Sequence, residues 1–111
     1  MQRFVFALDL KDDPALIAEY EKHHREVWPA ITKSIRDAGI TALDIFRTGN
    51  RLCMIMVTDD DFSFTKKDAM DAANPDVQAW EELMWQFQQA LPWAKPGEKW
   101  ILMDSIFELP A

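Results

Sequence analysis

The sequence contains few of the residues that mark several common chemistries. Its single cysteine, Cys53, cannot form a disulfide within the chain. This fits a reducing compartment, so we expect a cytoplasmic protein. Its three glycines, Gly39, Gly49 and Gly97, are isolated from one another and form no glycine-rich loop for phosphate groups. The longest apolar run, Leu52–Val57, is far shorter than the ~20 residues of a membrane-spanning helix.

Basic residues are also in the minority. The 111 residues include 12 Lys and Arg against 19 Asp and Glu, and the net charge is −7 at pH 7. Because this acidic excess repels phosphate backbones and anionic lipid headgroups, we expect neither nucleic acid nor a membrane as a partner. The content of hydrophobic residues, 49%, is ordinary for a globular protein. The length fits one domain that covers residues 1–111.

No group of residues has the spacing of a metal site. His23 and His24 are adjacent and point about 100° apart on a helix, which is poor geometry for binding one metal ion. Asp59, Asp60 and Asp61 follow one another, and a solvated turn is the simplest interpretation. We therefore expect no metal and no cofactor.

The periodicity of the apolar residues predicts the element order β-α-β-β-α-β. Alternation predicts strands at about residues 3–10, 41–48, 51–58 and 99–109. Apolar residues at steps of three and four predict helices at about residues 14–38, 62–73 and 75–91. Pro29 lies inside the first of these helices. Because proline lacks a backbone N–H and clashes with the carbonyl of Arg25, we expect a kink or break near Trp28.

This order is the ferredoxin-like arrangement, an α+β fold with helices on one face of a four-stranded antiparallel sheet. The third strand is apolar on both faces, from Leu52 to Val57, which predicts a central strand that is buried on both sides. Because one layer of helices covers one face only, we expect a second subunit to cover the other face, and hence a homodimer.

Tyr20 and His24 are the strongest candidates for chemistry. They are four residues apart on the first predicted helix, so they share its apolar, inward face. One interpretation is a structural histidine in the core that hydrogen-bonds to Tyr20 or to backbone. The other is a general acid/base that works near neutral pH, with Tyr20 orienting or sharing the proton. His23 lies off this face near Glu19, and we expect a surface ion pair there.

Tryptophans are the next candidates, because they build cores, binding walls and interfaces. Trp80 lies on the inward stripe of the last predicted helix, either as a core residue or as a stacking wall for a sugar ring. Trp85 lies about 140° from that stripe and is expected at an interface or at a pocket rim. Trp93, Lys99 and Trp100 lie around the loop before the last strand, where we expect a pocket edge.

The segment Tyr20–Pro29 carries a fairly specific pattern: Tyr, three residues, His, three residues, Trp-Pro. It resembles the L-rhamnose mutarotase family, and weaker matches extend to the ending Ile106–Pro110. The resemblance implies dimers of the dimeric α/β-barrel type, in which two sheets face one another. It also implies an isomerase, without metal or cofactor, that interconverts the α and β anomers of a 6-deoxyhexose pyranose, L-fucose or L-rhamnose.

By the same resemblance, His24 takes the position of the family's acid/base histidine, Tyr20 that of a sugar-binding tyrosine, and Trp80 that of the first of two adjacent tryptophans. Two positions depart from the family: a tyrosine of the second strand is Leu43 here, and the second tryptophan is Glu81. The other expected sugar contacts are Trp28, Trp85, Lys99 and Trp100.

These departures concern sugar contacts and leave the acid/base residue in place, so they bear on the substrate more than on the reaction. The stretch Glu98–Trp100 resembles relatives that look like L-fucose mutarotases, which favours L-fucose, with L-rhamnose close behind. The competing hypothesis is a cofactor-free monooxygenase or a haem-degrading enzyme of the dimeric α/β-barrel type, with His24 as the haem ligand. A small-molecule sensor and a purely structural dimerisation unit are further alternatives.

Overall fold

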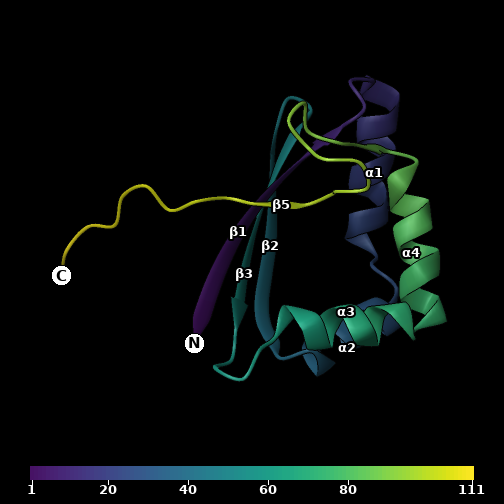
Figure 1. Cartoon of the computed structure of the whole chain (residues 1–111). Coiled ribbons are helices and arrows are strands. Elements are labelled where there is room, and N and C mark those ends of the chain that lie inside the picture. Colours follow the sequence, from purple (N-terminus) through teal and green to yellow (C-terminus); the bar gives the residue numbers. More distant parts are fainter.

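An antiparallel sheet forms the centre of the protein, and the helices lie on one side of it (Figure 1). The computed structural model describes residues 1–111. In chain order the elements are β1 (Gln2–Leu10), α1 (Pro14–Arg25), α2 (Pro29–Asp37), β2 (Ile40–Thr48), β3 (Arg51–Thr58), α3 (Phe64–Ala72), α4 (Pro75–Trp85), β4 (Gln88–Gln89) and β5 (Ile101–Leu102). The strand order is β2-β3-β1-β4, and β5 also pairs with β1. The predicted α+β, ferredoxin-like fold is therefore confirmed, with five strands instead of four.

β1 and β3 form the central pair of strands. Their register is continuous from Gln2 opposite Thr58 to Asp9 opposite Arg51. β2 pairs with the other edge of β3 after a tight turn in which Gly49 has a φ of 56°. Glycine adopts this conformation without steric cost. The first three predicted strands agree with the observed ones to within one residue at each end.

The first helical region is divided in two. Asp13 begins α1, because its side chain accepts hydrogen bonds from the backbone N–H groups of Ala15 at 2.9 Å and Leu16 at 3.2 Å. α1 ends at Arg25, and a new helix, α2, begins at Pro29. The predicted break is therefore confirmed, and two short helices take the place of one long helix over the sheet.

The last predicted helix ends earlier than expected. It stops at Trp85 as α4 and does not continue to Leu91, because the next residues pair with the end of β1, where Leu10 lies opposite Gln88. Phe87 and Leu91 are each only 3% exposed. These two apolar residues are thus buried as predicted, but they belong to a non-helical segment.

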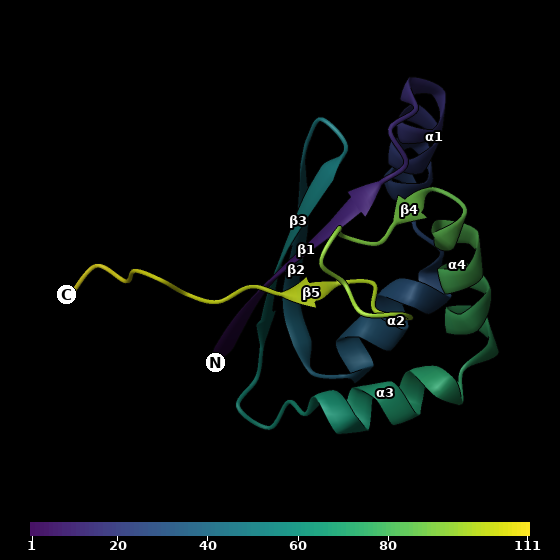
Figure 2. The ribbon, with the colours of Figure 1, turned by 45° about the horizontal axis from the view of Figure 1, so that its top comes forward.

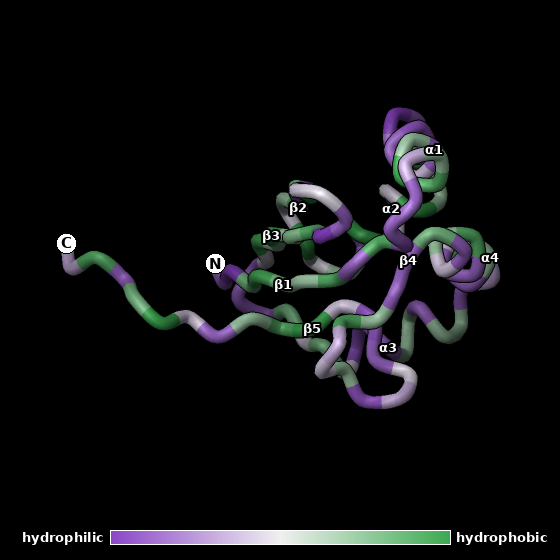
Figure 3. The backbone as a smooth tube through the Cα atoms, turned by 90° about the horizontal axis from the view of Figure 1, so that it is seen from above, coloured by the Kyte–Doolittle hydropathy of each residue, from purple (hydrophilic) through white to green (hydrophobic).

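The last predicted strand is shorter than expected. Only Ile101–Leu102 form β5, and the C-terminal segment Asp104–Ala111 extends away from the sheet (Figure 2). This segment has no strand of its own chain beside it, so the prediction of a strand is wrong beyond Leu102. Apolar residues are visible along it in Figure 3, and Ile106 and Phe107 are 96% and 76% exposed.

The two faces of the sheet differ in their cover. The inner face, toward the helices, carries side chains that are at most 8% exposed: Phe6, Leu8, Leu10, Leu52 and Met56. No helix covers the other face (Figure 2), which we call the open face. By the strand register, its apolar side chains are Val5, Phe46, Cys53, Ile55 and Val57.

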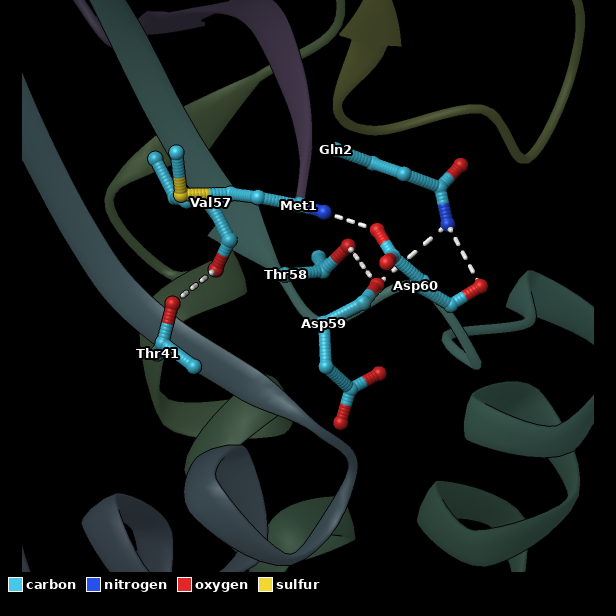
Figure 4. A network of polar contacts seen from close by, with 7 residues as sticks. All are labelled: Met1, Gln2, Thr41, Val57, Thr58, Asp59 and Asp60. Atoms are coloured by element: carbon cyan, nitrogen blue, oxygen red, sulfur yellow. Dashed lines mark hydrogen bonds and ion pairs between the residues drawn. The ribbon is translucent and has the colours of Figure 1, made fainter.

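The three aspartates Asp59–Asp61 follow β3 and form a turn that is tied to the N-terminus (Figure 4). The amino group of Met1 pairs with the Asp60 carboxylate, and Gln2 Nε2 donates to the carbonyl oxygens of Asp59 and Asp60, each at 3.3 Å. The Asp60 side chain is 83% exposed, in agreement with a solvated turn. No group of three or more His, Cys, Asp or Glu residues is placed to hold a metal ion. No helix has both the length and the apolar character that a membrane crossing requires.

Candidate active site

A cavity of about 250 Å³ lies between the helices and the inner face of the sheet. Thirteen of its 20 lining residues are hydrophobic. The volume is below the ~300–1,000 Å³ of pockets for drug-sized ligands, so the cavity suits a smaller molecule. Of the residues expected to carry chemistry or to bind a ligand, five line the cavity: Tyr20, His24, Trp80, Lys99 and Trp100.

His24 reaches the cavity from the C-terminal half of α1. Its Nδ1 lies 2.8 Å from the backbone carbonyl oxygen of Tyr20. Because a carbonyl oxygen can only accept, Nδ1 carries the hydrogen, and the lone pair of the neutral ring is on Nε2. No buried side-chain nitrogen or oxygen lacks a hydrogen-bond partner, so Nε2, which has none in the protein, is accessible from the cavity or solvent.

Burial controls the charge of His24. Desolvation lowers the pKa of its imidazole below the ordinary value of 6.5, against a smaller raising effect of the hydrogen bond to the Tyr20 carbonyl. The ring lies between aromatic neighbours, with its centroid 4.4 Å from that of Tyr20 and 5.7 Å from that of Trp80. His24 is therefore a neutral imidazole at pH 7, with its basic nitrogen available.

Tyr20 is one turn before His24 and is only 3% exposed. Its hydroxyl oxygen accepts a hydrogen bond from Gln88 Nε2 at 3.2 Å. Burial raises the pKa of the phenol above 10.0, although the hydrogen bond from Gln88 lowers it in part. Tyr20 is thus a neutral hydroxyl group at the cavity wall, able to donate its hydrogen.

Three of the predicted tryptophans do not line the cavity. Trp28 packs against Trp80, which does line the cavity, with ring centroids 5.1 Å apart, edge to face. Trp85 is 40% exposed, and Lys99 Nζ lies 5.0 Å from its ring centroid. Trp93 is 63% exposed. Of the tryptophans, Trp80 and Trp100 line this cavity.

His23 points to a different environment from its neighbour. Its Nε2 lies 4.0 Å from a carboxylate oxygen of Glu19, as the spacing of four residues predicted. Its ring also packs near Phe87, with centroids 5.5 Å apart. Two adjacent histidines on one helix thus have separate surroundings, and only His24 belongs to the cavity.

Several polar residues of the cavity wall were not singled out by sequence reasoning. They are Ser34, Gln88, and the ion pair formed by Lys67 and Asp71. Leu43 and Glu81, the two positions that depart from the family pattern, both line the cavity. The apolar cavity therefore has polar groups from α1, α2, α3, α4 and β4, which could hold a small polyhydroxylated ligand in one orientation.

Together, the fold and the cavity define a ferredoxin-like protein with a small binding site and a neutral histidine in its wall. The sequence profile of the family described as L-rhamnose mutarotase matches residues 3–109. The chain therefore belongs to the L-rhamnose mutarotase family. It is accordingly a carbohydrate isomerase of the mutarotase type, and the monooxygenase and haem-degrading alternatives are not favoured.

Individual relatives support this membership. An L-fucose mutarotase of Xanthomonas campestris pv. campestris is 53% identical over 111 residues, which cover 98% of this chain and 89% of the relative. Among solved structures, an L-rhamnose mutarotase from Formosa agariphila covers 99% of this chain and 100% of its own, with a TM-score of 0.73 and 21% identity. Tetracenomycin F2 cyclase from Streptomyces glaucescens covers the same shares, with a TM-score of 0.66 and 17% identity. At these identities the two structures show a shared fold alone.

Proposed function

We propose that this mutarotase interconverts the α and β anomers of L-fucose and that His24 is its general acid/base. The observation that carries the proposal is the hydrogen bond from His24 Nδ1 to a backbone carbonyl in the cavity wall. This bond leaves the lone pair of Nε2 free, and the lowered pKa keeps the ring neutral at pH 7. A general base needs both properties.

Anomer exchange requires one proton taken from the anomeric hydroxyl and one given to the ring oxygen. In the proposed mechanism, Nε2 of His24 takes the first proton while the bond between C1 and the ring oxygen breaks and the C1 carbonyl forms. The same histidine returns its proton to the ring oxygen. The C1–C2 bond of the open-chain aldehyde rotates, and the reverse steps close the ring on the other face. A single positioned acid or base accelerates such a step by ~10²–10⁴-fold.

Tyr20 assists by orienting the sugar. Because burial raises the pKa of its phenol, Tyr20 keeps its proton and donates a hydrogen bond to a sugar oxygen. The Trp80 ring stacks on the apolar face of the sugar, and Trp28 packs edge to face against the same ring. The reaction proposed here calls for no metal and no redox cofactor.

The preference for L-fucose over L-rhamnose is supported by the name of the relative that is 53% identical. The two sugars differ in configuration at C2 and C4, so they present different hydroxyl groups to the cavity wall. Glu81 contributes a carboxylate to this wall without a hydrogen-bonding partner in the protein. A site that hydrogen-bonds a hydroxyl discriminates strongly against analogues that leave its polar groups unpaired.

The test is exchange between the α and β signals of each sugar, measured by saturation-transfer proton NMR with and without the protein. We expect faster exchange for L-fucose than for L-rhamnose. Faster exchange for L-rhamnose would overturn the substrate and keep the reaction. No acceleration for either sugar, from a folded protein, would overturn the proposed function.

We also infer that the protein is a cytoplasmic homodimer in which the open faces of two sheets pack together. Two features support the dimer: the apolar side chains of the open face include Phe46, which is 56% exposed, and the C-terminal segment exposes Ile106, Phe107 and Leu109. Large exposed apolar patches usually mark interfaces. Sedimentation velocity is the direct test, and a monomer at micromolar concentration would contradict the proposal.

A further inference from the structure

Gln88 is a buried polar residue whose place depends on a short strand. It is 7% exposed and lies in β4, opposite Leu10 at the end of β1. This pairing turns its side chain into the cavity wall beside Tyr20, which comes from α1. Two elements that are far apart in the chain thus meet at a single hydrogen bond, from Gln88 Nε2 to the Tyr20 hydroxyl at 3.2 Å.

The direction of this hydrogen bond constrains the Tyr20 hydroxyl. A hydroxyl group has one hydrogen to donate and lone pairs that accept. Because the amide of Gln88 donates to the oxygen, the single hydrogen of the phenol is not used on Gln88. No other hydrogen bond involves the Tyr20 hydroxyl, so its hydrogen is left for whatever occupies the cavity.

We propose that Gln88 is a positioning residue, which holds the Tyr20 hydroxyl so that it donates its hydrogen to an oxygen of the bound sugar. This inference rests on the proposed function and adds to it a residue that acts on the sugar through Tyr20. A carboxylate in place of the amide would accept that hydrogen and turn it away from the sugar. A side chain without polar atoms would leave the hydroxyl free to rotate.

The other ionisable groups around the cavity come from four places in the chain. His24 is on α1, Glu81 is on α4, Lys99 precedes β5, and the ion pair of Lys67 and Asp71 is on α3. None of them forms a hydrogen bond with the Tyr20 hydroxyl. They are present in the wild type and in every Gln88 variant, so a pH effect confined to one variant reports the introduced group.

The first experiment compares anomer exchange in three single variants and the wild type. Gln88→Met should slow exchange by roughly two- to tenfold, the worth of one ordinary hydrogen bond. Gln88→Glu should slow it more at neutral pH. The ratio of its rate to the wild-type rate should rise as the pH falls, because the introduced carboxyl then becomes protonated and can donate as the amide does. Gln86→Glu adds the same charge at an exposed position of this turn and should leave the rate close to that of the wild type.

A double variant separates positioning from general packing. If Gln88 acts through the tyrosine, adding Gln88→Met to Tyr20→Phe should slow exchange no further, because the hydroxyl group it positions is already absent. Losses that add in full would mean that Gln88 acts by another route, and would overturn the inference.

The second experiment does not depend on activity. Tyr20 is the only tyrosine of the chain, so a ¹³C label at its ζ carbon gives a single NMR signal. We expect this signal to move in Gln88→Met and in Gln88→Glu and to stay in place in Gln86→Glu. In the two Gln88 variants the phenol should also ionise at higher pH, because the hydrogen bond that lowers its pKa is lost.

The outcomes are distinguishable. If the wild type accelerates exchange but the Gln88 variants match it and leave the tyrosine signal unmoved, the inference falls and the proposed function stands. If Gln88→Glu shows no pH-dependent recovery, the amide is not acting as a donor. If the signal moves but the wild type accelerates exchange of neither sugar, the hydrogen bond is real, and its role in anomer exchange is overturned together with the proposed function.

Discussion

The two faces of the sheet are built from alternate residues of the same strands, yet they meet different surroundings. On β3, Met56 points to the helices and is 2% exposed, while the adjacent Ile55 belongs to the open face. Helices of the same chain cover the inner face and enclose the cavity with it. Every residue of the proposed chemistry lies on that side of the sheet. The open face has apolar residues and no cover from this chain. An apolar strand can therefore pack against its own chain on one face and leave its other face to a partner, as the proposed dimer requires.

The largest expected effect tests whether catalysis depends on the cavity at the inner face of the sheet. His24→Ala should lower the rate of anomer exchange by ~10²–10⁴-fold, because it removes the general acid/base. His23→Ala is the matched control, since His23 is the adjacent residue and does not line the cavity. It should retain nearly full activity. The measurement is saturation-transfer NMR, with circular dichroism to check folding. Full activity in His24→Ala would refute the assigned role, and loss of folding would support a structural histidine.

The second effect compares the two faces through neighbouring residues. Met56→Ala should lower the free energy of unfolding by about 2–5 kcal/mol, because it leaves a cavity in a packed interior. Ile55→Ala should lower the stability by an amount that depends on protein concentration, because in the proposed dimer the loss falls on the association of subunits. Urea unfolding at two protein concentrations distinguishes these cases. An equal, concentration-independent loss in both variants would contradict the difference between the faces.

The third effect is a dependence on pH. Because the folded protein holds the pKa of His24 below its ordinary value of 6.5, the neutral base should persist to lower pH than a free histidine would allow. Activity should then fall as the pH drops through the lowered pKa. Stability should change with pH in the same direction as activity. Because His24 binds the proton more readily in the unfolded chain, the free energy of unfolding falls as the pH drops below about 6.5. Rate and urea profiles between pH 5 and 8 check both slopes, and a stability that rises toward acid would contradict the burial of His24.

The smallest effect concerns the outer rim of the cavity. Trp85→Ala removes an exposed ring that lies against Lys99. At exposed sites such a contact is worth about 0.5–1 kcal/mol, so the sugar concentration for half-maximal rate should rise only a few-fold, with the maximal rate unchanged. Titration of the exchange rate with sugar measures both quantities. A larger rise, or a lower maximal rate, would mean that Trp85 contacts the sugar directly.

Local rules predict much of the first half of the chain. Alternation locates the first three strands, and the missing N–H of Pro29 divides the first helix where expected. Beyond Trp85 these rules fail, because the structure depends on pairing partners elsewhere in the chain. An apolar stripe with Phe87 and Leu91 fits a helix as well as the observed strand and loop, and only the free edge of β1 decides between them.

The candidate site shows the same division. Tyr20 and His24 could be paired from the sequence, because residues four apart share one face of a helix. Gln88, Lys67 and Asp71 could not, since they reach the cavity from β4 and α3, away from α1, and no local pattern marks a polar residue as inward. Trp28, also expected as a sugar contact, packs against Trp80 with ring centroids 5.1 Å apart, and whether it meets the sugar stays a prediction.

The pairing of β1 with β3 also has a consequence for how the chain folds. The hairpin of β2 and β3 closes through a tight turn at Gly49 and involves neighbours only. β1 instead pairs Gln2 with Thr58, so the whole of α1, α2 and β2 forms a closed loop between them. Closing such a loop costs entropy before any contact compensates, and long-range strand pairing is intrinsically slow. We therefore expect the hairpin to form early, and the docking of β1, which completes the inner face of the sheet, to set the folding rate.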